Sequence, residues 1–221
     1  MNTLLSSPLA PLLTRLFAEA EAADAPFRAR ISQSSAEERA ALMRQAQTDY
    51  PSFYGLAKEM FLPVSPETGR LLYLLVRATK ARSIIEFGTS FGLSTLHLAA
   101  GLKDNGGGLV IGSEFEAGKV ARAKQNLLAA GLAELVEIRE GDALQSLSRE
   151  LPAVVDLLLL DGAKVLYPQV LALVEPRLRS GALVLADNAD HNPEFLAYIR
   201  NPANGYLSVP FAADVELFMR L

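Results

Sequence analysis

The sequence predicts an α/β fold in which helices cover both faces of a mostly parallel sheet. Two observations lead to this prediction. From residue 83 onward, short apolar runs alternate with helical segments, which is the pattern of a parallel sheet whose strands are joined by helices. The first of these runs also leads directly into a glycine-containing turn, Glu86 to Gly92, at the position where such sheets bind ligands.

Length and composition favour one domain. The chain has 221 residues, of which 50% are hydrophobic and 21% are charged, so it is long enough to bury a sizeable core and lacks the composition of a disordered or fibrous protein. We therefore expect a single domain, 1–221, made of an N-terminal helical extension (1–60) and a core (61–221).

Charge and cysteine content limit the class of partner. The formal net charge is −4 and cysteine is absent. Nucleic-acid binding draws on dense positive charge, so we expect a small-molecule partner and no nucleic acid. The lack of cysteine excludes disulfides and agrees with a cytoplasmic location. No apolar stretch approaches the roughly 20 residues needed to cross a bilayer, and the N-terminus lacks the basic residues of a signal peptide, so no membrane association is expected.

Helical patterns come first along the chain. Apolar residues recur at helical spacing from Pro8 to Glu21, and a second helix is expected over Ala36–Gln47. Prolines punctuate the next stretch, after which Glu67–Lys80 carries an apolar face. Because the sheet does not require the first two helices, we expect them to form dimer contacts or a lid over the substrate.

Strands and helices then alternate to the end of the chain. The expected strands are Ser83–Phe87, Leu109–Ser113, Val136–Arg139, Val155–Leu160, Ala182–Ala186, Gly205–Val209 and Val215–Met219. The expected helices are Ser94–Leu102, Glu116–Ala130, Ala143–Arg149, Tyr167–Leu178 and one around Pro193–Ile199. The last two strands are joined by only five residues, 210–214, so they are predicted to pair as an antiparallel hairpin at the edge of a seven-stranded sheet.

The turn after the first strand is the first candidate ligand site. Gly88 and Gly92 allow the backbone to turn sharply and to approach a ligand closely, although such turns also occur for packing reasons. The Gly-x-Gly-x-x-Gly pattern of dinucleotide sites is absent. Two further carboxylates, Glu114 and Asp142, stand at the ends of the second and third strands, where an acidic residue can hold ribose hydroxyls or remain solvated.

Oxygen ligands gather at the next two strand ends. Asp161 ends the fourth strand, and Asp187 and Asn188 end the fifth, so neighbouring strands bring the three side chains into one small volume. Two carboxylates and an amide suit a hard cation such as Mg²⁺. The alternative is a polar cluster that caps helices.

Taken together, these motifs resemble the cation-dependent O-methyltransferases of the catechol and caffeoyl-CoA type. The resemblance covers about 62–221 and is carried by Glu86-Phe-Gly-Thr-x-x-Gly, Glu114, Gly141-Asp142-Ala143, Asp161-Gly-Ala-Lys164 and Asp187-Asn188. It implies a Rossmann-like methyltransferase fold in which the core binds S-adenosyl-L-methionine and catalyses methyl transfer.

The resemblance also assigns roles to single residues. It implies a cofactor site formed by Val64, Glu86, Gly88, Ser90, Ser94, Glu114, Asp142, Ala143 and Asp161. The implied metal ligands are Asp161, Asp187 and Asn188, for Mg²⁺ or another divalent cation such as Ca²⁺ or Mn²⁺. Lys164 is the implied catalytic base, because a cation beside a lysine disfavours its ammonium form.

The activity implied is transfer of a methyl group to a hydroxyl of a small, aromatic, catechol-like acceptor (EC 2.1.1.-), by a homodimer. The alternatives are an NAD-dependent oxidoreductase of similar fold and a methyltransferase-like protein that binds without catalysis.

Several residues depart from the family pattern or lie beside it. Gly162 and Ala163, between Asp161 and Lys164, are small and predict extra space near the adenine or the acceptor. Asp214 and Glu216 are the only candidates for an acid that contacts a second acceptor hydroxyl. Among the histidines, His97 is expected to be a packing or surface residue, whereas His191 either lines the substrate mouth or is incidentally exposed.

Overall fold

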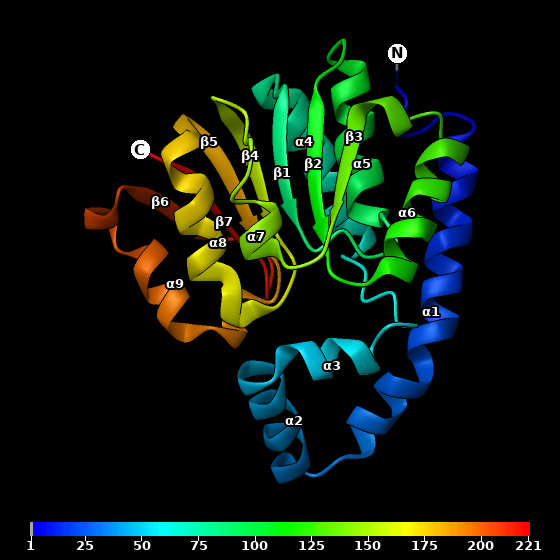
Figure 1. Cartoon of the computed structure of the whole chain (residues 1–221), viewed down its shortest axis with the longest axis vertical. Helices are drawn as coiled ribbons and strands as arrows, with labels where there is room; N and C mark the ends of the chain where they lie inside the picture. Colours follow the sequence, from blue (N-terminus) through cyan, green and yellow to red (C-terminus); the bar gives the residue numbers. More distant parts are fainter. Residues whose placement is uncertain (1) are drawn as a thin grey trace.

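The computed structural model describes residues 2–221, except for the side chains of Pro51 and Tyr54. It contains one sheet with the strand order β3-β2-β1-β4-β5-β7-β6 (Figure 1). The strands are β1 (Ser83–Phe87), β2 (Leu109–Glu114), β3 (Val136–Glu140), β4 (Val155–Leu160), β5 (Leu178–Ala186), β6 (Tyr206–Pro210) and β7 (Glu216–Arg220). Strand β7 runs antiparallel to β5 and β6, and the remaining neighbours are parallel. The predicted fold class is confirmed.

Helices lie on both faces of the sheet (Figure 1). The α-helices are α1 (Leu9–Gln33), α2 (Ala36–Thr48), α3 (Tyr50–Leu56), α4 (Pro66–Thr79), α5 (Leu93–Asp104), α6 (Ala117–Ala129), α7 (Ala143–Ser146), α8 (Tyr167–Val174) and α9 (Pro193–Arg200). Short 3-10 helices are η1 (Ala133–Leu135), η2 (Lys164–Leu166), η3 (Glu175–Arg177), η4 (Ala189–His191) and η5 (Pro202–Asn204).

Alternation along the central strands explains the two helical layers. Successive side chains of a strand point to opposite faces, so Ile85 packs in the cluster that contains Val170 of α8, whereas Ile84 packs in the cluster that contains Leu98 of α5. Strand β4 is buried on both faces and is accordingly an almost unbroken apolar run, Leu157–Leu160. The core therefore holds the carboxyl ends of β1 and β4 firmly in place.

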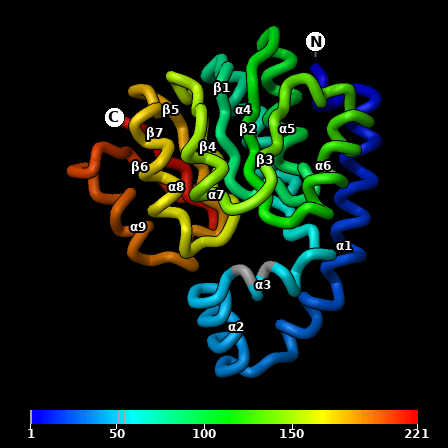
Figure 2. Tube along the Cα trace, in the orientation of Figure 1, coloured from blue at the N-terminus to red at the C-terminus, as the bar shows by residue number. Residues whose placement is uncertain are grey.

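The N-terminal extension differs from the prediction. Helix α1 does not end near Glu21 but continues through Pro26 to Gln33. Proline disfavours the interior of a helix, but alanine and arginine, which favour a helix, surround it, and the side chain of Asp24 is buried against the segment that precedes α4. Helix α3 was not predicted. It begins at Tyr50, so Pro51 occupies the first turn, where proline removes no intrahelical hydrogen bond. Figure 2 shows α2 and α3 beneath the carboxyl ends of the strands.

Helices α7 and α8 are both shorter than expected. Helix α7 ends at Ser146 rather than Arg149, because the chain turns and the carbonyls of Ser146 and Arg149 accept hydrogen bonds from Arg139. The segment after α8 forms η3 and then enters β5 at Leu178, four residues earlier than predicted. Pro176 lies in η3, and a proline ring disfavours continuation of an α-helix.

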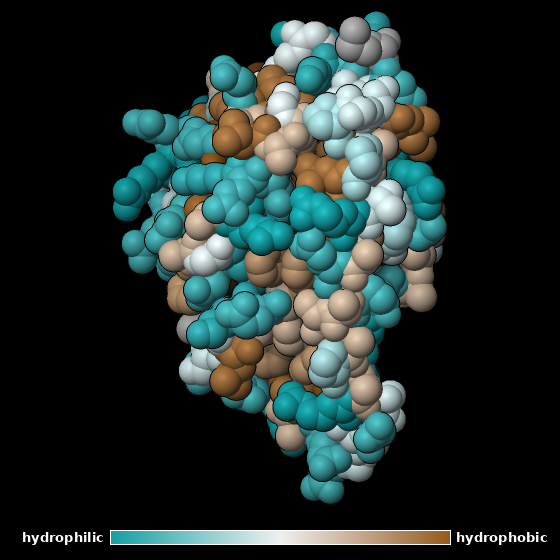
Figure 3. Space-filling model, turned by 90° about the vertical axis from the view of Figure 1, so that its right-hand side faces the viewer, coloured by the Kyte–Doolittle hydropathy of each residue, from teal (hydrophilic) through white to brown (hydrophobic). Residues whose placement is uncertain are grey.

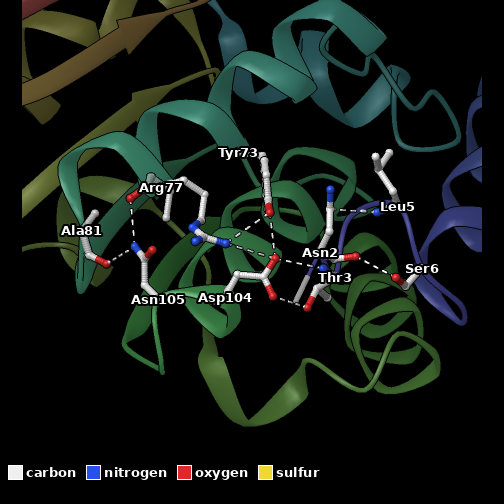
Figure 4. A network of polar contacts seen from close by, with 10 residues as sticks. Asn2, Thr3, Leu5, Ser6, Tyr73, Arg77, Ala81, Asp104 and Asn105 are labelled. Atoms are coloured by element: carbon white, nitrogen blue, oxygen red, sulfur yellow. Dashed lines mark hydrogen bonds and ion pairs between the residues drawn. The ribbon is translucent and has the colours of Figure 1, made fainter.

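The start of the chain is fixed to α4 and α5 through Asp104 (Figure 4). The backbone N–H and the hydroxyl of Thr3 donate to its carboxylate at 2.8 and 2.6 Å, and the Tyr73 hydroxyl donates at 2.7 Å. Arg77 forms an ion pair with the same group at 3.4 Å. Burial alone would raise the pKa of Asp104, but these contacts outweigh it and hold the pKa below its ordinary value.

The α1 side of the molecule mixes hydrophilic and apolar residues over its surface, and the molecule narrows toward α2 (Figure 3). Across residues 2–221, no helix combines the length and the apolar character that spanning a membrane requires.

Candidate active site

Glu86 organises the turn that follows β1. Its side chain is fully buried, and its carboxylate accepts hydrogen bonds from the hydroxyls of Thr89, Ser94 and Thr95 at 2.9, 2.7 and 2.6 Å. Burial raises the pKa of Glu86, and the three hydroxyls act in the opposite direction. Glu86 lies beneath the turn and lines none of the cavities described below, so its contribution here is to fix the shape of the turn.

Gly88 brings the ends of β1 and β4 together. Its φ of +99° lies in a region that favours glycine, and a Cβ at this position would lie 2.5 Å from the carbonyl oxygen of Asp161. The Asp161 N–H donates to the carbonyl of Phe87 at 2.8 Å. The first strand end is thus in direct backbone contact with the residue predicted to bind both cofactor and metal.

A cavity opens at the carboxyl ends of β1 to β4, which we call the strand-end cavity. Its lining includes six of the predicted cofactor residues: Gly88, Ser90, Glu114, Asp142, Ala143 and Asp161. Val64 and Ser94 line a narrow adjoining cleft, together with Gly88 and Asp161. The carboxylate of Glu114 accepts N–H hydrogen bonds from Ser90 at 2.7 Å and Glu116 at 2.9 Å, which aligns the second strand end with the turn.

Several residues of this cavity were not anticipated from the sequence, among them Phe115 and Lys119. Phe115 lines it and is 51% exposed, and Lys119 lines it from the first turn of α6 although its side chain is buried. Burial lowers the pKa of Lys119, while Glu114 and Asp24 act in the opposite direction. Both residues lie within five positions after Glu114, so their place directly after this strand end could have indicated them.

A second cavity lies between the strand ends and the N-terminal helices, and we call it the helix-capped cavity. Its apolar lining comes from Phe27, Ile31, Leu42, Met43, Ala46, Phe53, Leu62 and Val165. Its polar lining comes from Asp161, Lys164, Asn188 and His191 near the strand ends, which we call the polar end, and from Arg39 and Gln47 of α2. Leu62 and Asp161 line both cavities. The sequence motifs gave no sign of this lining, because most of it comes from α1 to α3, outside the strand ends.

The polar end contains a closely coupled acid pair. Lys164 Nζ lies 3.2 Å from Asp161 Oδ1, and the carboxyl groups of Asp161 and Asp187 form a hydrogen bond with each other. Burial and the nearby Asp161 carboxylate raise the pKa of Asp187 to about 8, against the opposing effect of Lys164. The pKa of Asp161 is also raised, mainly by burial. The pair therefore shares a proton at neutral pH.

Asn188 completes the predicted ligand set beside this pair. It has a left-handed backbone, with φ +47°, and its amide donates to Asp214 at 3.3 Å. Glu216 lies elsewhere, held by Arg200 at 2.9 and 2.6 Å. Of the two candidate acids, only Asp214 is at the site. Among residues 2–221, no three His, Asp or Glu side chains gather as a metal site by themselves, so oxygen ligation here also requires the amide.

Gly162 does not leave the extra space that we expected, although it lines the strand-end cavity together with Ala163. A Cβ on Gly162 would lie 2.4 Å from the Phe87 ring, because that ring already occupies the volume. His97 is a packing residue: it is buried, and its Nδ1 is hydrogen-bonded to the Leu93 carbonyl at 2.8 Å. His191 lines the helix-capped cavity.

The sheet order is that of a Rossmann-like methyltransferase. The chain superimposes on a methyltransferase from Geobacter sulfurreducens with a TM-score of 0.63 and 25% identity, over 90% of this chain and 98% of that one. It matches an O-methyltransferase from Streptomyces achromogenes, determined in complex with SAM, with a TM-score of 0.64 and 25% identity, over 81% of this chain and 89% of that one.

The chain belongs to the O-methyltransferase family, whose model matches residues 32–202. It is also similar to a catechol O-methyltransferase of Niastella koreensis, with 35% identity over 130 residues. This similarity covers 58% of the present chain and 58% of the length of that curated relative.

Proposed function

We propose that this protein transfers a methyl group from S-adenosylmethionine to a hydroxyl of a small aromatic acceptor, with the help of a divalent cation. The observation that carries the proposal is the meeting of the two cavities at Asp161, 3.2 Å from the amine of Lys164. A methyl donor in one cavity and an acceptor in the other would meet beside a base and a cluster of oxygen ligands.

The strand-end cavity fits the donor. Gly88 lets the backbones at the ends of β1 and β4 approach each other beside this cavity, and Glu114 retains lone pairs for ribose hydroxyls after accepting two N–H groups. Phe115 offers an exposed aromatic face next to Asp142 and Ala143, which suits an adenine ring. The donor supplies an electrophilic methyl on a sulfonium, whose sulfur leaves uncharged and therefore needs no acid.

The helix-capped cavity fits the acceptor. Its lining is mainly apolar and includes Asp161, Lys164 and Asn188, so a flat apolar molecule would bind there with its hydroxyl directed toward Lys164. Helices α2 and α3 supply much of this lining and would exclude water from the reacting groups.

The oxygen ligands fit a divalent cation. Asp161, Asp187 and Asn188 would hold it, and the raised pKa of Asp187 shows that the two carboxylates repel each other when no cation neutralises them. A bound cation would supply Lewis-acid stabilisation of the acceptor oxygen and lower the pKa of its hydroxyl. Lys164 in its neutral amine form would accept the hydroxyl proton, and Asp161 orients Nζ through their 3.2 Å contact.

We further propose that the chain acts as a single domain, in the cytoplasm, as a homodimer. The extension and the core share one apolar cluster, in which Leu9, Leu12 and Leu16 of α1 pack with Leu96 of α5, which supports the single domain. Equilibrium sedimentation of the full chain tests the dimer.

Calorimetric titration tests the proposed donor. S-adenosylmethionine should bind the purified chain at one site, with a Kd in the micromolar range, and Glu114→Ala should weaken it about tenfold or more. Absence of binding would overturn the proposed function. Binding of a nicotinamide dinucleotide in its place would favour the oxidoreductase alternative.

A further inference from the structure

Asp24 is a buried carboxylate in the middle of α1, far along the chain from every strand end. Its side chain is almost inaccessible, with the residue 2% exposed. One carboxylate oxygen accepts the N–H of Phe61 and the other accepts the N–H of Leu62, each at 2.9 Å. These two bonds join α1 to residues 60–64, a segment that we call the strap.

The strap is joined to the turn after β1 on its other side. The Ser90 hydroxyl donates to the Phe61 carbonyl at 2.8 Å, and the rings of Phe61 and Phe91 stack with their centroids 4.1 Å apart. The ammonium of Lys119 lies 5.5 Å from the centroid of the Phe91 ring. The strap is therefore held between α1 and the turn that shapes the strand-end cavity.

Leu62 places the strap at the boundary between the two cavities. Its side chain lines the strand-end cavity, the helix-capped cavity and the adjoining cleft. Its φ is +45°, a conformation that a bulky residue adopts only when its surroundings impose it. The N–H of Leu62 is one of the two groups bound by Asp24, so this carboxylate helps to impose the strained conformation.

We propose that Asp24 is a positioning residue that holds the strap closed over the methyl donor and slows its release. The inference rests on the proposed function, and it assigns a role to a residue outside the range 32–202 that matches the family. Asp24 itself lines neither the strand-end nor the helix-capped cavity. It acts through the backbone of Phe61 and Leu62.

The test compares Asp24→Asn with Glu21→Gln, the same change at an exposed acid of the same helix. Side-chain exposure of Glu21 is 76%. The first measurement, amide hydrogen exchange at Phe61 and Leu62 in the free protein, needs no ligand. Asp24→Asn should accelerate exchange of these amides at least tenfold, because an amide side chain offers one acceptor in place of two. Glu21→Gln should leave it unchanged.

The second measurement is dissociation of S-adenosylmethionine by stopped-flow. Asp24→Asn should raise the dissociation rate and the donor KM about tenfold, with a smaller change of kcat at saturating donor. If Asp24 only stabilised the fold, Asp24→Asn would lower the melting temperature of the free protein without changing the dissociation rate or the donor KM. Asp24→Glu keeps two acceptor oxygens but displaces them by one methylene, so release should again accelerate, and this variant decides the question if Asp24→Asn does not fold.

The outcomes separate the two claims. If the wild-type chain does not bind S-adenosylmethionine, the proposed function fails, whatever the exchange data show. If the wild-type chain binds it and Asp24→Asn, or Asp24→Glu where Asp24→Asn does not fold, leaves its release unchanged, the proposed function stands and the role of Asp24 is wrong.

Discussion

The chemistry of the site depends on a few residues whose charges are coupled. Asp161 and Asp187 hydrogen-bond to each other, and Lys164 contacts Asp161. Two carboxyl groups this close cannot both ionise easily in a buried site, so one retains a proton until a cation or a higher pH removes it. Under the proposed function, a cation that binds this cluster would therefore displace that proton.

We predict that Mg²⁺ binds more tightly as the pH rises. The pKa of Asp187 is raised to about 8, so below that pH the cation competes with a proton, and affinity should fall by up to about tenfold per pH unit. Above pH 8 the affinity should level off. Calorimetry from pH 6 to pH 9 measures this dependence, with Asp190→Asn, an exposed neighbour, as the control. Affinity that does not vary with pH would contradict the assignment.

At the scale of elements, the turn after β1 and the N-terminal helices have different roles. The turn is built on Glu86, which binds three hydroxyl groups within the fold, whereas the helices line the helix-capped cavity. The polar groups of the turn are satisfied within the fold, and under the proposed function the helices would determine which acceptor fits.

We predict that Glu86→Ala destabilises the protein by about 2–4 kcal/mol, because the hydroxyls of Thr89, Ser94 and Thr95 lose their common acceptor while they remain buried. Denaturant unfolding without cofactor measures the loss. Glu140→Ala, at an exposed strand end, should change stability by less than about 0.5 kcal/mol. Equal effects of the two substitutions would count against a structural role for Glu86.

We predict that Ala46→Phe on α2 blocks the helix-capped cavity, which Ala46 lines. The larger ring would fill space needed by the substrate, so the acceptor KM should rise about tenfold or more while the donor Kd stays unchanged. The matched control is Ala41→Phe, an exposed position of the same helix. Steady-state kinetics with catechol as acceptor would refute the assignment of this cavity if both variants behaved like the wild type.

At the scale of the whole molecule, the N-terminal segment is joined to the core by the buried carboxylate of Asp104. The pKa of Asp104 is lower in the folded state than the ordinary value of 3.8. The ionised Asp104 carboxylate therefore stabilises the folded state fully above about pH 4, and this stabilisation is lost as the pH falls through the folded-state pKa.

We accordingly predict that Asp104→Asn lowers the free energy of unfolding at pH 7 by about 1–3 kcal/mol. The difference from the wild type should shrink below pH 4, where the wild-type carboxylate becomes protonated as well. Denaturant unfolding at pH 7 and pH 3 measures both values, and Asp49→Asn, on the exposed surface, is the control. A difference that is the same at both pH values would contradict the ionic origin of the effect.

The sequence predicted the sheet well because strand patterns and strand-end carboxylates are local features. All seven strands and the candidate residues at their ends could be located in this way, since Asp161 and Asp187 follow apolar runs directly. The lining of the helix-capped cavity and the contacts of the strap could not be located in this way. Asp24 and Leu62 meet across 38 residues, and nothing in the local pattern of α1 reports which distant backbone groups its buried carboxylate will bind.

The central claim is methyl transfer at the junction of the two cavities, and one measurement tests it most directly. The purified chain is incubated with S-adenosylmethionine carrying a labelled methyl group, catechol and Mg²⁺, in parallel with Lys164→Met. We predict labelled methyl ether from the wild type, and a rate at least about 100-fold lower from Lys164→Met, whose donor Kd should be unchanged. Equal rates from the two proteins, with the donor bound by both, would contradict the account.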